Sequence, residues 1–372
     1  MRIVIVRRES KVAFSMDVYA DNLVLQLKAL HPEWEIIEIA PQPWSKDLEN
    51  LWHSGNPLRK YYERFFNHPR SVNKLEADIF HIIDHTNAHI AYWLKKSGKT
   101  AIVTCHDLVQ YVYPEILKNQ SRFPAFSLAT WEYSVKGINV ADRTIGVSTN
   151  TANDISQWLN VDPKKIDVVF NGVESDFQVL PSKVAKCWRQ KHVSSPAEIC
   201  ILNIGSTHQR KNIITILKAI KAIAERGIEI RLWKIGDDFS PAQKQFIQDS
   251  FLEQHITLLG KPNRENLVRF YNAADVLLAP SLYEGFGLTI LEAMACGTPV
   301  ITSNVSSLPE VAGDGAILVN PMDLEAIIQA ILRLQQDARY RQTLIARGLA
   351  QATKFTWKKT ATNVAQIYKQ LV

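Results

Sequence analysis

Residues 275–302 are the stretch that most limits what this chain can fold into. An apolar run at 275–279 is followed by Gly285-Phe286-Gly287, and then by apolar residues at helical spacing. Gly297 ends the helical pattern, and a second apolar run begins at Val300. The order of strand, glycine loop, helix and strand is typical of an α/β sheet whose strands run parallel.

The glycine loop and the helix behind it predict a site for an anion. A helix N-terminus presents N–H groups without partners and the positive end of the helix dipole. Glu284 and Glu292 flank this loop, and carboxylates placed there can accept hydrogen bonds from sugar hydroxyls. An alternative stays open, because Thr289-x-x-Glu292 also fits a capping box that would only secure the start of the helix.

Short apolar runs alternate with helical patterns along the rest of the chain. In the first half the expected strands are Ile3–Val6, Glu35–Ile39, Ile79–Ile83, Ala101–Cys105, Arg143–Val147 and Asp167–Phe170. In the second half they are Ile199–Ile204, Arg231–Gly236, His255–Gly260, 275–279, Val300–Thr302 and Ala316–Val319. This alternation predicts doubly wound parallel sheets, whose ligands lie at the carboxyl ends of the strands.

Composition places the chain among globular, two-domain proteins. Its 372 residues are 46% hydrophobic and 22% charged, and no apolar run is long enough to span a bilayer. The apolar start, Met1–Val6, is too short for a signal peptide. The four cysteines (Cys105, Cys187, Cys200 and Cys296) lack metal or redox spacing, which predicts reduced thiols and a cytoplasmic protein.

The positive charge lies mostly in the second half of the chain. The net charge is +6, and residues 181–372 hold 23 Lys and Arg against 16 Asp and Glu. This excess suits an anionic ligand, although solvated lysine faces would explain much of it. It is too moderate, and too poor in stacking motifs, for a nucleic-acid partner.

A second glycine loop follows the strand at 199–204. It reads Gly205-Ser-Thr-His-Gln-Arg-Lys-Asn212 and leads into a helix from Ile213. Arg210 and Lys211 thus stand at a helix N-terminus, where cations oppose the dipole unless an anion lies between them. We therefore expect a diphosphate here.

His106 directly follows the predicted strand Ala101–Cys105, at the edge of the sheet where ligands bind. A purely structural histidine is the alternative. His81, His85 and His89 have near-helical spacing but lack suitable neighbours for a metal site, so we predict no metal.

Two longer segments carry a family resemblance. EGFGLTILEAMACGTPVITS, followed by SSLPEVAGDGAILVNPMD, resembles the donor-site signature of the retaining, nucleotide-sugar-dependent glycosyltransferases of family 4. The similarity covers most of the chain and is weaker in the first 100 residues. It implies the GT-B fold, with two Rossmann-like doubly wound domains facing each other across a cleft. Residues 1–178 would form the acceptor-side domain, 179–355 the donor domain joined through a linker near Gln178–Pro196, and 356–372 a helix crossing back to the first domain.

The resemblance also implies roles for residues. His106, Lys211 and Glu284 would be catalytic: His106 contacts the transferred sugar, Lys211 the diphosphate, and Glu284 the sugar hydroxyls. Glu292 would hold the ribose and Lys261 would lie against the base. The full set of donor-binding residues would be Gly205, Ser206, Arg210, Lys211, Lys261, Gly285, Phe286, Gly287, Leu288, Thr289 and Glu292.

The sequence departs from the family pattern at two places. The Gly-Gly loop of many members is missing after the first strand, where Ser15 is the only small polar candidate. Ser206 stands where the family has an Arg, so Arg210 is the expected substitute. No convincing Asp-x-Asp motif is present, and we expect lysine, arginine and N–H groups to do the work of a metal; no cofactor is expected.

The predicted function is transfer of a mannose- or glucose-type hexose from a nucleoside-diphosphate sugar to a glycan or lipid-linked acceptor. The alternatives are a nucleotide-sugar 2-epimerase-like isomerase and a non-catalytic sugar-nucleotide-binding subunit. The segment 53–70 mixes basic and aromatic residues. Either Leu58, Tyr62, Phe65 and Phe66 pack inward on a helix, which we favour, or the segment contacts an anionic membrane at the inner face.

Overall fold

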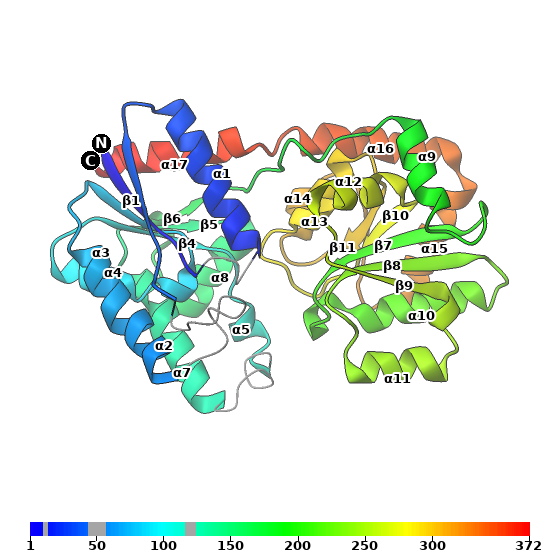
Figure 1. Ribbon diagram of the computed structural model, residues 1–372, viewed down its shortest axis with the longest axis horizontal. Helices are drawn as coiled ribbons and strands as arrows, with labels where there is room; N and C mark the ends of the chain where they lie inside the picture. Colours follow the sequence, from blue (N-terminus) through cyan, green and yellow to red (C-terminus); the bar gives the residue numbers. More distant parts are fainter. Residues whose placement is uncertain (10–13, 44–56, 116–123) are drawn as a thin grey trace. The chain divides into compact units, whose positions relative to one another are not determined.

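The computed structural model describes residues 1–9, 14–43, 57–115 and 124–372, and divides the chain into two compact units. The first contains residues 1–172 together with 357–372, and the second contains residues 173–356. The change of unit thus falls after Gly172, whereas the sequence suggested Gln178. Each unit is built on one six-stranded sheet with all strand pairs parallel (Figure 1).

The first unit has strand order β2-β1-β3-β4-β5-β6. These strands are β1 (Arg2–Val6), β2 (Glu35–Ile39), β3 (Ile79–Ile82), β4 (Ala101–Cys105), β5 (Arg143–Gly146) and β6 (Ile166–Val168). Its longer helices are α1 (Phe14–Leu30), α4 (Ile90–Lys96), α7 (Pro124–Val135), α8 (Thr149–Leu159) and α17 (Trp357–Leu371). The shorter helical pieces are α2 (Pro57–Tyr62), a π-helix at Glu63–Asn67, α3 (His68–Asn73), α5 (Val109–Val112), and 3₁₀ turns at His85–Asn87, Lys136–Val140 and Pro163–Lys165.

Helices cover both faces of the first sheet. On one face α1 packs against α17, and their buried side chains join Ile3, Ile5 and Ile102 in one core cluster. On the other face α4, α7 and α8 pack over Val4, Phe80 and Val103. The strands are buried on both sides, which explains why they read as continuous apolar runs.

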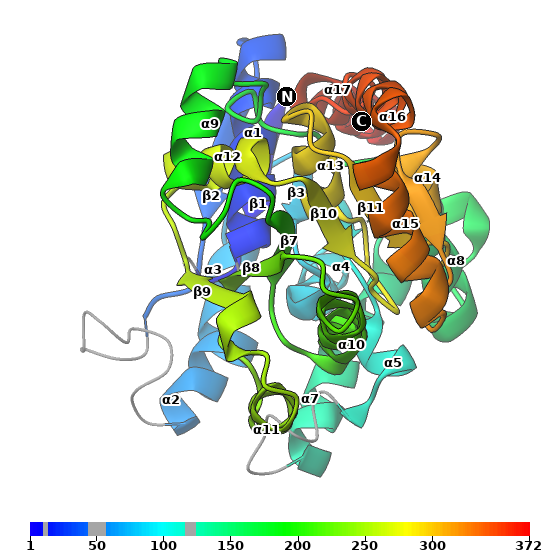
Figure 2. The ribbon, with the colours of Figure 1, turned by 90° about the vertical axis from the view of Figure 1, so that its right-hand side faces the viewer.

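The second unit has strand order β12-β11-β10-β7-β8-β9. These strands are β7 (Ile199–Gly205), β8 (Ile230–Gly236), β9 (Ile256–Gly260), β10 (Val276–Ala279), β11 (Val300–Ser303) and β12 (Ile317–Val319). The helices are α9 (Ser182–Gln190), α10 (Ile213–Ala224), α11 (Pro241–Asp249), α12 (Arg264–Ala273), α13 (Leu288–Ala295), α14 (Leu308–Ala312), α15 (Leu324–Gln336) and α16 (Ala338–Ala352), with 3₁₀ turns at Gln209–Lys211 and Glu253–His255. Figure 2 shows α10 and α15 together on one face of this sheet, with α12 and α13 on the other.

The predicted linker contains a helix that the sequence analysis missed. Helix α9 occupies Ser182–Gln190 and packs against α12, with the Trp188 and Phe270 rings 5.3 Å apart. Arg269 lies over the Trp188 ring, 5.1 Å from its centroid. Polar residues and Pro181 indicated a linker, but Pro181 is the N-cap just before this helix, where its missing N–H removes no hydrogen bond of the helix.

The preferred interpretation of the segment 53–70 is wrong for three of its four side chains, whereas Phe65 is half-buried with its ring 4.7 Å from that of His89. Residues 44–56 lie outside the described part, but in α2 and the following π-helix Leu58, Tyr62 and Phe66 are exposed by 77%, 61% and 58%. Glu63 turns inward instead, where its carboxylate accepts hydrogen bonds from Gln42 N at 2.8 Å and Asn67 Nδ2 at 2.6 Å. The hydrogen bonds satisfy the buried charge, so the aromatic stripe faces outward.

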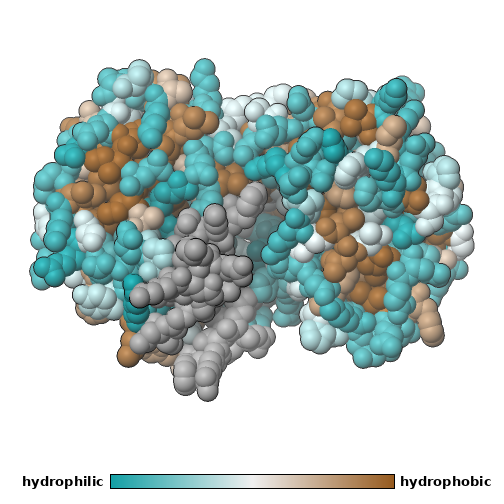
Figure 3. Space-filling view, viewed as in Figure 1, coloured by the Kyte–Doolittle hydropathy of each residue, from teal (hydrophilic) through white to brown (hydrophobic). Residues whose placement is uncertain are grey.

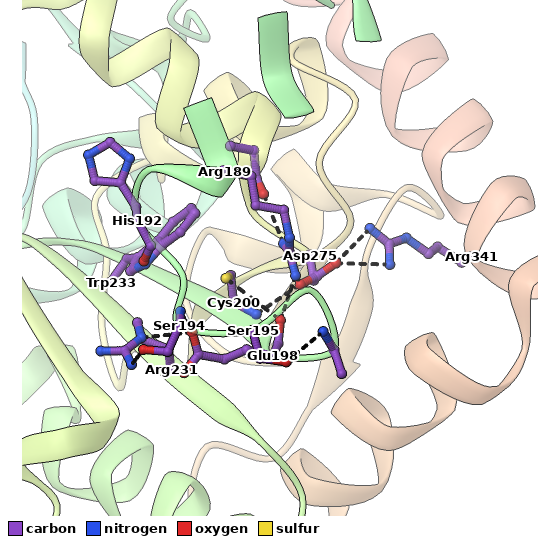
Figure 4. A network of polar contacts seen from close by, with 12 residues as sticks. Arg189, His192, Ser194, Ser195, Glu198, Cys200, Arg231, Trp233, Asp275 and Arg341 are labelled. Carbon is purple, nitrogen blue, oxygen red and sulfur yellow. Dashed lines mark hydrogen bonds and ion pairs between the residues drawn. The ribbon is translucent and has the colours of Figure 1, made fainter. Parts of the chain in front are cut away.

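A polar network fastens α9 and α16 to the amino ends of β7 and β10 (Figure 4). The Asp275 carboxylate accepts from Cys200 N at 2.8 Å and pairs with Arg189 at 2.7 Å and Arg341 at 3.3 Å. Glu198 pairs with Arg231 at 2.8 Å beside it. This network lies at the opposite end of the strands from the glycine loops, and it serves the fold.

The surface of both units mixes apolar and polar side chains (Figure 3). An open groove between α11 and β9 is lined by Phe239, Ile247, Ile256 and Leu258, with Lys244, Gln248 and Glu253 at its margin. None of the helices in the described ranges has the length and apolar character that crossing a bilayer requires.

Candidate donor site in the second unit

The two glycine loops of the sequence analysis meet in the second unit. One loop follows β7 and the other follows β10, and these strands are neighbours in the sheet. The loops are joined directly, because Leu282 N donates to Arg210 O at 2.7 Å. Both therefore lie at the carboxyl edge of a parallel sheet, where such folds bind ligands.

Asn212 holds the first loop in place. Its backbone is left-handed, with φ 55°, and it caps helix α10. The buried side chain donates through Nδ2 to Pro280 O at 3.1 Å and to Pro321 O at 2.7 Å, and Oδ1 accepts from Thr215 at 2.7 Å. The turn containing Arg210 and Lys211 is thus tied to two other segments of the unit.

Arg210, Lys211 and Glu284 form one cluster. The Lys211 ammonium contacts Glu284 Oε1 at 2.5 Å, and Arg210 Nη1 contacts Glu284 Oε2 at 2.8 Å. Ser281 Oγ donates to the same carboxylate at 2.7 Å. Burial alone would raise the pKa of Glu284, but Lys211 and Arg210 outweigh it and lower this pKa to about 2.

This cluster gives Glu284 partners within the protein. The sequence suggested a carboxylate that orients sugar hydroxyls, which stays a prediction, and the structure shows it paired with both cations of the loop. Two cations share one carboxylate, so the cluster keeps a net positive charge. A diphosphate is the kind of ligand such a cluster can attract.

The backbone after Glu284 is held from the side by two serines. Ser306 and Ser307 both donate to Glu284 O, at 2.6 and 2.9 Å, and Ser307 also donates to Phe286 O at 3.0 Å. Phe286 is buried, with its ring 5.9 Å from that of Phe355. Gly285, which lies between Glu284 and Phe286 in the sequence, is partly accessible.

Gly287 caps helix α13, which begins at Leu288. Its φ is 104°, and a Cβ placed there would lie 2.9 Å from Leu308 Cδ2. Because the N-cap is Gly287, Thr289 lies inside the first turn, and the capping box proposed as an alternative for Thr289 and Glu292 is wrong.

Glu292 has another partner. Its carboxylate accepts a hydrogen bond from Tyr271 Oη at 2.6 Å. Burial raises the pKa of Glu292 to about 7, although the Tyr271 hydrogen bond and Arg264 oppose the change. The predicted contact with a ribose stays a prediction.

The remaining donor-binding candidates lie at the edge of the same region. Gly205 ends β7 with φ 125°, and a Cβ there would lie 3.7 Å from Lys211 Nζ. Ser206 follows it and is partly accessible. Lys261 is exposed and pairs with Asp237 at 3.1 Å, so β8 and β9 meet here. Its contact with a base stays a prediction.

His106 belongs to the first unit, at the carboxyl end of β4. It is buried, and its Nε2 lies 2.8 Å from Ile83 O. Burial lowers the pKa of His106, against the attraction of Asp84, and a carbonyl oxygen only accepts. The ring is therefore neutral, with the proton on Nε2 and the lone pair on Nδ1.

The other histidines near β3 point to separate partners. His81 binds Tyr368 and Thr104, and His89 Nε2 lies 2.9 Å from Arg64 O. Among the described residues, no group of three or more His, Cys, Asp or Glu side chains could hold a metal ion. Ser15 lies in the exposed first turn of α1, and residues 10–13 before it fall outside the described part.

Sequence reasoning missed Asn212, Tyr271, Ser281 and Ser307. Asn212 carried a usable signal, because asparagine tolerates the left-handed region and often stands at a helix start. Tyr271 carried none: it lies inside the amphipathic pattern of α12 and looks like an ordinary core residue.

Comparison with known proteins now adds to this geometry. Residues 185–370 match the family model for glycosyl transferases group 1, and residues 16–177 match that for glycosyltransferase family 4. The chain is 34% identical over 289 residues to O-antigen chain mannosyltransferase B of Escherichia coli, covering 75% of this chain and 73% of the relative.

Solved structures resemble the whole fold. Sucrose-phosphate synthase from Thermosynechococcus elongatus superposes with a TM-score of 0.79 at 24% identity, covering 100% of this chain and 99% of that one. HepE from Anabaena in complex with UDP-glucose gives 0.77 at 17% identity, covering 100% of both chains.

Two parallel six-stranded sheets, with paired glycine loops at the carboxyl edge of one of them, define a protein of the GT-B class. The chain belongs to the glycosyl transferases group 1, family 4, and is a glycosyltransferase. This sets aside the isomerase and the non-catalytic subunit considered from the sequence.

Proposed function

We propose that this enzyme transfers a mannose-type hexose from a nucleoside-diphosphate sugar to a glycan or lipid-linked acceptor, with retention of configuration and without a metal ion. Mannosyltransferases of O-antigen chains among its relatives support the sugar and the glycan acceptor. The complex of HepE with UDP-glucose supports a nucleotide-sugar donor.

The observation that carries the proposal is the cluster of Arg210, Lys211 and Glu284. Lys211 and Arg210 approach a single carboxylate from one loop, next to a helix N-terminus on the other. Departure of a nucleoside diphosphate builds negative charge on its oxygens, and fixed cations lower the barrier by stabilising that charge. These side chains supply the positive charge for which many glycosyltransferases use a metal.

In the proposed reaction the bond between the anomeric carbon and the diphosphate oxygen breaks, and a bond from that carbon to an acceptor hydroxyl oxygen forms on the same face. The acceptor proton passes to the departing diphosphate oxygen, so no protein nucleophile is required. Arg210, Lys211 and the N–H groups at 285–288 stabilise the leaving group, and Glu284 keeps both cations oriented.

The first unit offers a surface that suits a lipid-linked acceptor. Leu58, Tyr62 and Phe66 form an exposed stripe at i, i+4 and i+8, and Arg59 and Arg70 are exposed on the same segment. Apolar and aromatic side chains flanked by arginines can lie on an anionic lipid surface. We include peripheral membrane contact in the proposal on this ground.

The test uses the full chain with GDP-mannose, UDP-glucose and ADP-glucose in separate reactions, with mannose-terminated oligosaccharides as acceptors. Each is run in EDTA and again with Mg²⁺, and the anomeric configuration of the product is read by NMR. We expect one donor to give a product of unchanged configuration in EDTA. An inverted product, or activity that needs Mg²⁺, would overturn the corresponding part of the proposal.

Thermal unfolding with GDP, UDP and ADP identifies the base. A ligand at 100 times its dissociation constant stabilises the folded state by about 2.7 kcal/mol, which a shift in melting temperature reveals. The absence of any shift would contradict a preformed diphosphate site.

A further inference from the structure

Lys234 is a buried cation that has no part in the reaction proposed above. It lies in strand β8 with no exposed surface, among the otherwise apolar residues Leu232, Trp233 and Ile235. Its ammonium donates to Gly205 O at 2.6 Å and to Ile235 O at 3.0 Å. Both acceptors are neutral, and among the described residues no ion pair joins Lys234 to a carboxylate.

Keeping a lysine at this place has a cost. Burial lowers the pKa of Lys234 to about 8, Asp237 opposes this change, and Lys211 adds to it. Asp237 favours the charged form of Lys234, yet it forms its ion pair with Lys261. The two carbonyl oxygens satisfy its hydrogen bonds, but they do not neutralise its charge.

The carbonyl that Lys234 holds belongs to the first glycine loop. Gly205 is paired with Gly236 across β7 and β8, and Asp237 N donates to Gly205 O at 3.3 Å. A Cβ on Gly236 would lie 2.4 Å from Gly205 O, so the two strands meet there more closely than any other residue allows. Lys211 also lies close to Gly205, since a Cβ placed on this glycine would be 3.7 Å from Lys211 Nζ.

The charges that face this region come from several segments. Arg210 and Lys211 lie on the turn before α10, Asp237 and Lys261 follow β8 and β9, and Glu284 follows β10. Burial and Arg210 lower the pKa of His208, so it is neutral above pH 7. With Asp237 and Lys261 cancelling, three cations stand against one carboxylate. The surplus of two positive charges matches the two negative charges of a diphosphodiester.

We propose that Lys234 is a positioning residue of the donor site, which fixes the Gly205 peptide and supplies a buried positive charge that the donor's diphosphate neutralises. This inference rests on the proposed function, because it takes its ligand from there. It makes donor binding and protonation of Lys234 mutually dependent: the bound diphosphate favours the charged lysine, and loss of the proton weakens binding.

The test measures the affinity of the full chain for GDP, UDP, ADP and inorganic pyrophosphate by calorimetry at pH 7, 8 and 9. Above pH 7 the terminal phosphate of a nucleoside diphosphate, with a pKa of roughly 6, is almost fully ionised and adds little to the profile. Pyrophosphate still loses a proton in this range, so it is compared at pH 7 alone. For the wild type we expect the dissociation constant of the tightest ligand to rise about tenfold from pH 7 to pH 9, with uptake of a fraction of a proton at pH 8.

Three variants complete the design. Lys234→Met keeps the length and removes the charge, so we expect about tenfold weaker binding at pH 7 and little change from pH 7 to pH 9. Lys234→Arg keeps the charge at every pH and should bind at pH 9 as it does at pH 7. Lys221→Met removes a lysine from the outer face of α10, and it should behave as the wild type.

The outcomes separate the role of Lys234 from the proposed function. A flat wild-type profile, or a Lys234→Met protein with wild-type affinity and pH dependence, would overturn the role of Lys234 and leave the donor site intact. Failure of the wild type to bind any of the four ligands would overturn the proposed function and this inference with it. If Lys234→Met does not fold, the wild-type and Lys234→Arg profiles still decide.

Discussion

At the scale of single residues, the candidate donor site is organised by Glu284. This one carboxylate receives Lys211, Arg210 and Ser281, and the attraction of the two cations outweighs the cost of its burial. In the structure the Lys211 ammonium, the Arg210 guanidinium and the Ser281 hydroxyl all donate hydrogen bonds to the Glu284 carboxylate. A diphosphate that enters must therefore compete with Glu284 for its cations, and it gains from positions that are already set.

Lys211→Ala tests the catalytic cation. The loss of a donor to the leaving group should lower the rate of transfer by about two orders of magnitude or more. Turnover with the preferred donor is the measurement, and Lys218→Ala, at an exposed position on α10, is the matched control. Near-normal transfer by Lys211→Ala would remove this residue from the mechanism.

Glu292→Gln separates stability from function. The folded-state pKa of about 7 lies above the unfolded value near 4.5, so the carboxyl favours folding most below pH 4.5, and this contribution is lost as the pH rises through 7. Relative to the wild type, the Gln variant should gain up to about 3 kcal/mol of unfolding free energy between pH 4.5 and pH 8. Urea unfolding at both pH values measures this gain.

At pH 8, where the Glu292 carboxyl is mostly ionised, the same variant should bind the donor about tenfold more weakly if Glu292 accepts hydrogen bonds from the ribose, since bonds to a charged acceptor are the stronger ones. Glu325→Gln, exposed at the start of α15, is the control for loss of a charge. Unchanged donor affinity would assign Glu292 to the Tyr271 contact alone.

Much at this scale was predictable from the sequence. Arg210, Lys211, Glu284 and Glu292 were all identified from glycine loops and helix starts, because such local patterns are written in consecutive residues. Their partners were not. Tyr271 and Ser307 reach these residues from other segments, and nothing in their own neighbourhood announces it.

At the scale of elements, the start of α13 decides the shape of the loop. Gly287 takes a φ of 104° and stands against Leu308, so the backbone turns abruptly from the loop into the helix. The first turn of this helix, with its N–H groups, begins at Leu288, four residues after Glu284. A side chain at position 287 would disturb both features.

Gly287→Ala should lose about 1–3 kcal/mol of unfolding free energy from backbone strain, with a further cost from the Leu308 contact. It should also weaken binding of the nucleoside diphosphate. Gly227→Ala is the control, because φ there is 74° and a Cβ would meet nothing within 4 Å. Both variants should be destabilised, and only Gly287→Ala should lose affinity, as measured by urea unfolding and calorimetry. Equal affinities would show that the loop tolerates the change.

Elements with long apolar runs or a clear hydrophobic periodicity were predicted well, and elements that mix polar and apolar residues without such a pattern were not. The strands of both sheets came from continuous apolar runs. Helix α9 was taken for a linker, since no residue of it is fully buried and its contacts are made by a few half-buried side chains such as Trp188. In the segment that starts at Pro57, the prediction buried Tyr62 and Phe66, whereas the structure buries Glu63. The charge of Glu63 can be buried because groups from outside the segment, such as Gln42 N, donate hydrogen bonds to it.

At the scale of the whole molecule, the chain returns at its end to the unit in which it began. Helix α17 covers α1 and the first sheet, and Tyr368 places its hydroxyl 2.6 Å from His81 Nδ1. His81 Nε2 continues to Thr104, which also meets Tyr19. The last helix is therefore part of the first core.

Tyr368→Ala should lower the stability of the first unit by about 3–5 kcal/mol, because it empties a fully buried site. Tyr368→Phe should lose about 1–3 kcal/mol, since it removes only the hydroxyl that meets His81. Hydrogen exchange should quicken in β1 and β3 and remain unchanged in β7 and β10. Gln366→Ala, on the exposed side of α17, is the control. Equal acceleration in both sheets would contradict two separate units.

The sequence alone determined the class of fold and the two glycine loops, because each rests on patterns of neighbouring residues that local physics can interpret, and its resemblance to a known signature indicated the family. The tertiary structure decided which groups meet: Lys211 with Glu284, Lys234 with Gly205, Tyr368 with His81. These pairs join residues from 29 to 287 positions apart. Their hydrogen bonds and burial exist only once the sheets have brought the segments together. A pattern of neighbouring residues does not show which distant residues will meet.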